Sequence, residues 1–170
     1  TGFETVSHAA TIADNILHNE QGKGFRHIWT PPTKYAGRGV TIADYDEDGD
    51  TDIYISNYRL HRNFAWENQG DGSFENIGAD SVLEGIGTES GPLQLYYGHT
   101  IGSAWGDVDN DGDLDLALSG ENVIPEGGLG NVTEFYLNDP PGTLSLASNI
   151  ALIDNNSGRP LTIRRGSLAW

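Results

Sequence analysis

Short runs of alternating apolar and polar residues, separated by glycine-rich turns, make up most of this chain. Residues 53–56 and 116–119 alternate in the manner of half-buried strands, and strand-like runs at 39–43 and 102–106 lie just before them. No long window has the 3.6-residue apolar period of a helix, and residues 9–18 come nearest to one. Glycine supplies 23 of the 170 residues, about twice its usual share of ~7%. This pattern predicts an all-β fold.

A strand, a tight turn and a second strand recur three times along the chain. Residues 64–74 show this hairpin pattern most clearly, residues 16–25 repeat it with one residue fewer, and residues 135–144 repeat it more loosely. In each copy an apolar strand ends near an asparagine, and glycine allows the turn to use a positive φ. We therefore expect three β-hairpins.

Two acidic segments, residues 44–52 and 107–115, lie between these hairpins and start 63 residues apart. Each has aspartate at five alternate positions and glycine at the sixth. Five carboxylates within nine residues repel one another unless a cation lies among them. Oxygen ligands at positions 1, 3 and 5, a turn-forming glycine at 6 and a backbone carbonyl at 7 suit a hard cation such as Ca²⁺. We expect one Ca²⁺ in each segment, two ions in all.

An EF-hand shares the first half of this pattern but needs a bidentate Glu at position 12 and flanking helices. Position 12 is Ile55 in the first segment and Leu118 in the second, so the closing ligand is missing. The segments therefore join two strands, and Asp52 or Asp115 at position 9 is expected to complete the coordination. A solvated acidic turn is the other interpretation, and two copies in register between apolar strands disfavour it.

The net charge of −16 depends largely on these segments, which hold eleven of the 25 acidic residues. Two bound Ca²⁺ would leave a charge of about −12, still acidic enough to disfavour nucleic acid and anionic membrane surfaces. Loops of this kind suit millimolar calcium, which predicts an extracellular or cell-surface location. No apolar run is long enough to insert into a membrane. Asn131 and Asn155 match the N-glycosylation pattern and are candidate glycan sites.

Residues 39–55, 68–74 and 102–118 resemble FG-GAP/VCBS repeats, the calcium-binding blades of integrin-alpha-type β-propellers and of many bacterial surface proteins. The resemblance covers about residues 14–170, although residues 139–141 depart from the pattern. It implies β-propeller-type blades, which are four-stranded antiparallel sheets, with Ca²⁺ between the first two strands. It also implies side-chain ligands from Asp44, Asp46, Asp48, Asp52, Asp107, Asp109, Asp111 and Asp115, and main-chain oxygens from Asp50 and Asp113.

The repeats divide the chain into about two and a half blades. Residues 1–36 would end one blade, with a hairpin near 15–28, and residues 165–170 would begin another, because they resemble residues 101–105. The two complete blades are expected at 37–98, with the hairpin 64–77, and at 99–164, with a hairpin near 135–150. A propeller needs at least four blades to close, so we expect an incomplete ring, either a fragment of a longer repeat protein or one completed by neighbouring chains. Residues 77–98 are expected to form a surface loop.

No catalytic constellation is evident. Paired acids can hydrolyse glycosides, but here they are assigned to metal, and the five histidines show no ligand spacing. The sequence has no serine elbow, phosphate loop or dinucleotide fingerprint. Trp29, Trp66 and Trp105 could line a carbohydrate site, although large aromatic residues in a β-rich chain are more often core.

Three functions remain open. The favoured one is a non-catalytic, calcium-stabilised extracellular module for binding or adhesion, with a protein or glycan ligand. The first alternative is a structural subunit of an extracellular filament or surface assembly that pairs with copies of itself. The second alternative is a propeller attached to a secreted carbohydrate-active enzyme.

Overall fold

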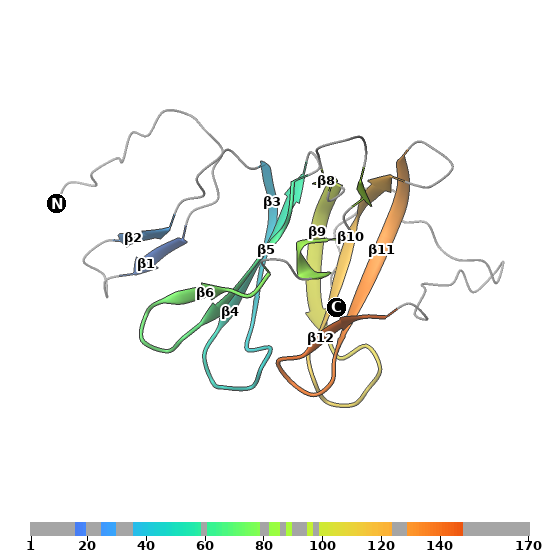
Figure 1. Ribbon diagram of the computed structural model, residues 1–170. Coiled ribbons are helices and arrows are strands. Elements are labelled where there is room, and N and C mark those ends of the chain that lie inside the picture. Colours follow the sequence, from blue (N-terminus) through green and yellow to red (C-terminus); the bar gives the residue numbers. More distant parts are fainter. Residues whose placement is uncertain are drawn as a thin grey trace.

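The computed structural model describes residues 16–19, 25–29, 36–58, 61–78, 82–85, 88–89, 95–96, 99–123 and 129–147. Within these ranges the chain forms strands and one short 3₁₀ helix, and no α-helix (Figure 1). The elements are β1 (Ile16–Asn19), β2 (Phe25–Trp29), β3 (Ala36–Ala43), β4 (Asp52–Tyr58), β5 (Phe64–Asn68), β6 (Phe74–Asn76), η1 (Val82–Glu84), β7 (Thr88–Glu89), β8 (Leu95–Tyr96), β9 (His99–Gly106), β10 (Asp115–Val123), β11 (Leu129–Asn138) and β12 (Leu144–Leu146).

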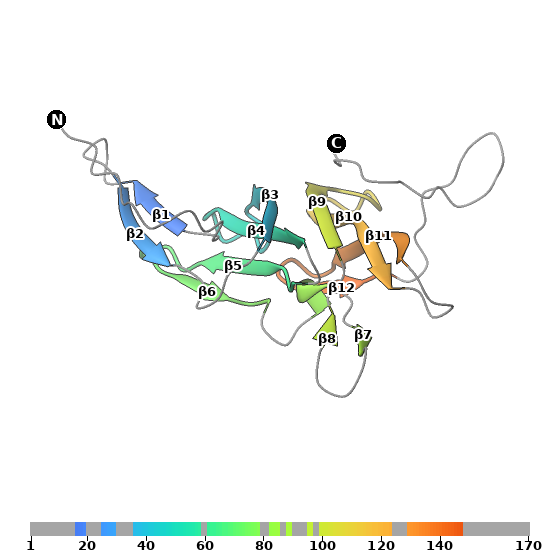
Figure 2. The ribbon, with the colours of Figure 1, turned by 90° about the horizontal axis from the view of Figure 1, so that it is seen from above.

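Two four-stranded antiparallel sheets dominate the fold. The first blade has the strand order β3-β4-β5-β6 and the second has the order β9-β10-β11-β12, so each strand pairs with its neighbour in sequence. This up-and-down order is that of a propeller blade. Figures 1 and 2 show the two sheets beside each other, with the β1–β2 hairpin on the far side of the first blade. The predicted all-β fold with four-stranded blades is confirmed, and the described residues form an open arc rather than a closed ring.

The two blades use the same register. Ala43 pairs with Asp52 where β3 turns into β4, and Gly106 pairs with Asp115 where β9 turns into β10. The acidic segments therefore close equivalent hairpins. The expected hairpins at 64–77 and near 135–150 are β5–β6 and β11–β12.

The main core lies between the two blades. Tyr54 and Ala65 of the first blade form a buried cluster with Leu116, Leu118 and Tyr136 of the second. Strand alternation places Ile55 on the opposite face of the first blade, where a second cluster forms with Phe64 and Trp66. Full burial of one such side chain stabilises the fold by roughly 1.5–3 kcal/mol, so this shared core holds the blades together.

The two tryptophans whose side chains the structure describes belong to the hydrophobic core and do not line an exposed carbohydrate site. Trp66 is buried in the second cluster, and Trp105 packs against the cluster between the blades. No side-chain surroundings are described for Trp29.

Residues 77–98 were expected to form a surface loop, and this expectation is wrong for Leu83 and Glu84, whose side chains are buried. Leu83 joins the core between the blades, and its carbonyl accepts a hydrogen bond of 2.7 Å from the Tyr54 hydroxyl. Nothing in the pattern of this glycine-rich segment marks which of its apolar residues reaches the core, which is why the sequence did not reveal Leu83.

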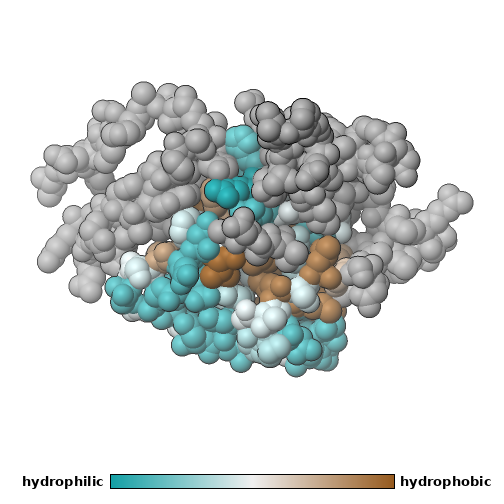
Figure 3. Space-filling view, in the orientation of Figure 1, coloured by the Kyte–Doolittle hydropathy of each residue, from teal (hydrophilic) through white to brown (hydrophobic). Residues whose placement is uncertain are grey.

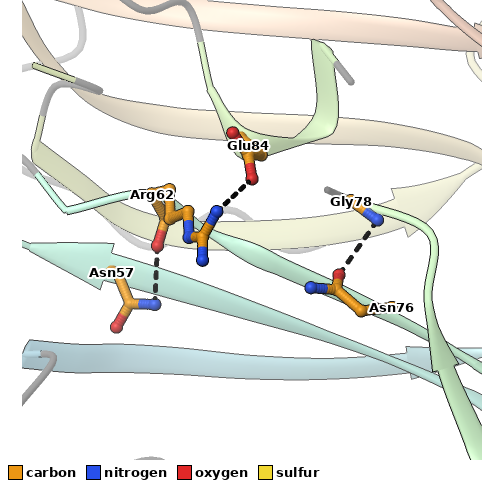
Figure 4. A network of polar contacts seen from close by, with 5 residues as sticks. All are labelled: Asn57, Arg62, Asn76, Gly78 and Glu84. Carbon is orange, nitrogen blue, oxygen red and sulfur yellow. Dashed lines mark hydrogen bonds and ion pairs between the residues drawn. The ribbon is translucent and has the colours of Figure 1, made fainter. Parts of the chain in front are cut away.

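A polar network fixes this segment to the first blade (Figure 4). Arg62 Nη1 lies 3.1 Å from Glu84 Oε1, and the Arg62 carbonyl accepts a bond of 2.9 Å from Asn57 Nδ2. Gly78 N donates to Asn76 Oδ1 at 3.1 Å. Because Glu84 is buried, the Arg62 guanidinium supplies the charge that makes its burial tolerable.

Two predictions fall outside the described residues. These are the strand at 165–170 and the sequon at Asn155. Asn131 lies in β11, but nothing of its side chain is described. Among the described residues, no helix has the length and apolar character needed to span a membrane.

Candidate metal centres

Both acidic loops lie at the same end of the molecule. They connect β3 to β4 and β9 to β10, and the turns of β5–β6 and β11–β12 lie at this end as well (Figure 1). Figure 3 shows hydrophilic residues gathered over this end of the described surface. The repeat thus gathers the eleven acidic residues of the two loops in one region.

Three carboxylates converge in each loop. In the first loop Asp44, Asp46 and Asp48 each offer an oxygen atom, and these atoms lie within 4.8 Å of one another. The backbone winds around them, because Gly49 N donates to Asp44 Oδ2 at 3.1 Å and Asp50 N donates to Asp48 Oδ1 at 2.8 Å.

The second loop repeats this arrangement, except that its third carboxylate comes from position 9 of the loop instead of position 5. Asp107, Asp109 and Asp115 form its oxygen cluster within the same 4.8 Å limit. Gly112 N donates to Asp107 Oδ2 at 3.2 Å, and Asp113 N donates to Asp111 Oδ1 at 3.0 Å. These bonds correspond to the two described in the first loop.

The backbone conformation of the two loops also matches. The fourth position has a positive φ in both, 62° at Glu47 and 67° at Asn110. The sixth position does too, 96° at Gly49 and 109° at Gly112. Positive φ strains a residue such as Glu, and strain of this kind is concentrated at functional sites. The sequence predicted the turn at the glycine but not the one at position 4.

The aspartates at position 9 anchor the loops. Asp52 and Asp115 are 3% and 2% exposed, and each accepts two backbone N–H groups. Asp52 binds Tyr45 N at 3.2 Å and Asn68 N at 2.8 Å. Asp115 binds its counterparts, Val108 N at 2.7 Å and Asn138 N at 3.0 Å. Each aspartate therefore fastens the start of its loop to the hairpin of the same blade.

The structure thus brings six of the ten predicted ligands into two compact clusters. Asp115 belongs to one of them, whereas Asp52, Asp50, Asp111 and Asp113 lie outside both. The ligand roles implied by the resemblance, including main-chain oxygens from Asp50 and Asp113, stay predictions.

Comparison with protein families gives one match. Residues 44–118, from the first position of the first loop to the strand after the second, match the family model of the FG-GAP-like repeat. This part of the chain is similar to the FG-GAP-like repeat. This confirms the resemblance stated on sequence grounds. Comparison with curated proteins found no match, and comparison with solved structures found none. FG-GAP repeats are in general non-catalytic binding modules and are typically extracellular.

The electrostatics of the two acidic loops fit a hard cation. Asp44 Oδ1 is buried and has no hydrogen-bond partner. Burial raises the pKa of Asp52 to about 6, against the lowering effect of its two N–H donors, and the charges of Asp46 and Asp48 add to the rise. Desolvation and the charges of neighbouring aspartates also raise the pKa of Asp109. A buried oxygen without a donor, close to aspartates such as Asp52 whose pKa is raised, is the environment that a divalent cation relieves.

The donor set also indicates which cation. The clustered side chains offer only carboxylate oxygens, which Ca²⁺ and Mg²⁺ accept and which soft transition metals do not prefer. Ca²⁺ tolerates six to eight oxygen ligands in irregular geometry, whereas Mg²⁺ requires a near-ideal octahedron. A short loop lined by aspartates suits the first requirement better.

Proposed function

We propose that the chain is a calcium-stabilised, non-catalytic binding module of the extracellular space, with one Ca²⁺ held in each acidic loop. The observation that carries this proposal is the repeated carboxylate cluster, centred on Asp44 in the first blade and on Asp107 in the second. The same loop backbone and the same anchoring aspartate accompany it in both blades.

Calcium acts in this proposal as a structural clamp. Each loop joins the first two strands of a blade, and without a cation its carboxylates repel one another where those strands must pair. A ligand that binds only the folded state stabilises that state by mass action, by ≈ 2.7 kcal/mol at a concentration of about 100 times its Kd. The bound ions would therefore stabilise the pairing of β3 with β4 and of β9 with β10.

The proposed location follows from the same site. Aspartate loops of this type suit millimolar calcium, which is the extracellular level. The net charge of −16 disfavours nucleic acid as a partner. The ligand of the module is proposed to be a protein or a glycan, and Asn131 and Asn155 stay candidate glycosylation sites.

One observation favours the second candidate, a structural subunit of an extracellular assembly. Val40 and Ile42 of β3 are 65% and 64% exposed. Their counterparts in β9, Ser103 and Trp105, pack against the first blade, and Ser56 Oγ donates to Ser103 Oγ at 3.1 Å. The exposed face therefore has the position and character of a surface on which another blade packs. The attachment to a secreted carbohydrate-active enzyme is a further alternative that no described contact favours.

Isothermal titration of the chelated protein with Ca²⁺, and separately with Mg²⁺, tests the proposal. We expect heat from Ca²⁺ at millimolar concentration or below and weaker binding of Mg²⁺. A calcium titration without heat, together with an unchanged melting temperature, would show that the loops are plain acidic turns.

A further inference from the structure

The two acidic loops are linked by one buried residue, Asn138, at the end of β11. Asn138 is 1% exposed. Its Nδ2 donates to the carbonyl oxygen of Tyr45 in the first loop at 2.5 Å and to that of Leu114 in the second loop at 3.2 Å. Its backbone N donates to Asp115 Oδ1, and its Oδ1 accepts a bond from Thr143 N, each at 3.0 Å. A residue of the second blade thus holds the backbone of the first blade's loop.

The corresponding residue of the first blade, Asn68, shows what is particular to this contact. Its backbone N donates to Asp52 Oδ1 at 2.8 Å, its Nδ2 to the Thr51 carbonyl at 3.3 Å, and its Oδ1 accepts from Gly70 N at 3.2 Å. The first two bonds match those of Asn138 within its own blade, whereas the Asn138 Oδ1 accepts from Thr143 N, further along its turn. The bond from Asn138 to Tyr45 is the addition, and it crosses the junction between the blades.

The turn after Asn138 also lies against the first loop. Gly142 has a φ of 82°, and a Cβ built there would lie 3.1 Å from the Cβ of Asp46. That is closer than most Cβ contacts, so the hairpin turn restricts the position of a clustered carboxylate. On the other side, the Tyr45 ring packs 6.0 Å from the Trp105 ring, centroid to centroid. Asp46 and its neighbour Tyr45 are therefore both held by the second blade.

From these contacts we infer that the β11–β12 turn of the second blade is an outer wall of the first calcium site, so that the affinity of the first loop depends on the second blade. This inference rests on the proposed function, because it requires that the first loop bind Ca²⁺. The dependence is directional. Gly142 approaches Asp46 of the first loop, and no described contact of Gly142 reaches the carboxylate cluster of the second.

The test measures each site alone. Asp107→Asn with Asp109→Asn leaves only the first loop competent, and Asp44→Asn with Asp46→Asn leaves only the second. Gly142→Ala is then introduced into each background, and the Kd for Ca²⁺ is measured by calorimetry. Changes to groups that support metal ligands usually cost 10–100-fold in affinity, so we expect a loss of about tenfold or more in the first-loop background. The second-loop background should change by less than about threefold.

Gly72→Ala is the matched control. Gly72 occupies the same place in the β5–β6 turn, with a φ of 86°, so alanine imposes a similar backbone strain there. We expect Gly72→Ala to leave the first-loop affinity within about threefold of its background. Equal losses from the two alanine variants in the first-loop background would overturn the inference, because they would show strain rather than contact with Asp46.

A second readout covers the case in which Gly142→Ala prevents folding. Asn138→Leu keeps nearly the size of the side chain, adds no charge and removes the donor to the Tyr45 carbonyl, so it should also weaken Ca²⁺ binding in the first-loop background. By linkage, Ca²⁺ in that background should slow hydrogen exchange at the Thr143 amide. Unchanged affinity in Asn138→Leu and unchanged exchange at Thr143 would reject the coupling. Absence of binding in the unsubstituted protein would instead reject the proposed function.

Discussion

The two blades share a sequence pattern and a register, yet their first strands, β3 and β9, have different surroundings. In the second blade Ser103 and Trp105 of β9 pack on the first blade, whereas the equivalent Val40 and Ile42 of β3 are exposed. The first loop, in turn, is supported by Asn138 of the next blade. The loop and hairpin are therefore properties of a single repeat, while a buried face and a supported loop require a neighbour.

Calcium removal should produce the largest effect on this pair of blades. Two sites, each at about 100 times its Kd, would stabilise the fold by roughly 5 kcal/mol in total. Chelation should therefore lower the urea midpoint strongly. Asp46→Ala and Asp109→Ala should each lower the midpoint in calcium and change little in EDTA. Equal losses in both conditions would mean that neither aspartate acts through metal.

The core between the blades should show the next largest effect. Leu116 is fully buried there, and truncation of such a leucine costs about 2–5 kcal/mol. The equivalent residue in the first blade, Ile53, is only partly buried. Leu116→Ala should therefore reduce the free energy of unfolding more than Ile53→Ala, as measured by urea denaturation in calcium. The reverse order would show that the second blade does not depend on this contact.

The dependence of stability on pH should be smaller and should change sign with calcium. Burial raises the folded-state pKa of Asp52 from 3.8 to about 6 in the calcium-free protein. The corresponding stability is present below the unfolded pKa and is lost as pH rises through about 6. The calcium-free protein should therefore become more stable as pH falls from about 7 to about 5. The calcium-loaded protein should become less stable, because protons compete with Ca²⁺ for the carboxylates.

Thermal melts at several pH values, with calcium and with EDTA, measure the slope of stability against pH in each condition. Slopes of the same sign in both conditions would contradict a cation site that includes these carboxylates. Asp71, whose pKa is lowered by its hydrogen bonds from Ser73, lies outside the clusters and provides a reference, because Asp71→Asn should leave the difference between the slopes unchanged.

The exposed face of the first blade should show the smallest effect on stability. Val40→Thr and Ile42→Thr should change the free energy of unfolding by less than about 0.5 kcal/mol, because surface substitutions rarely change it more. If copies of the chain pack through this face, the same variants should weaken self-association in sedimentation experiments. Association that is unaffected by both variants would remove the assembly alternative for this surface.

The fold and the clusters were largely predictable because their signals are local. Alternation at 53–56 and 116–119, and aspartates at fixed spacing, specify strands and loops within a few residues of chain. The burial of Leu83 and the bond from Asn138 to Tyr45 were not predictable, since both depend on which parts of two blades meet. The positive φ at Glu47 was missed for a different reason, because Glu rarely adopts that conformation and gives no sign of it in sequence.

The number of calcium ions bound per chain tests the central claim most directly. Equilibrium dialysis against Ca²⁺, followed by metal analysis, should give two ions for the unsubstituted protein. It should give one for Asp44→Asn with Asp46→Asn, one for Asp107→Asn with Asp109→Asn, and none when the four changes are combined. Binding that is absent from the unsubstituted protein, or unchanged by the four substitutions, would contradict the assignment of the acidic loops as calcium sites.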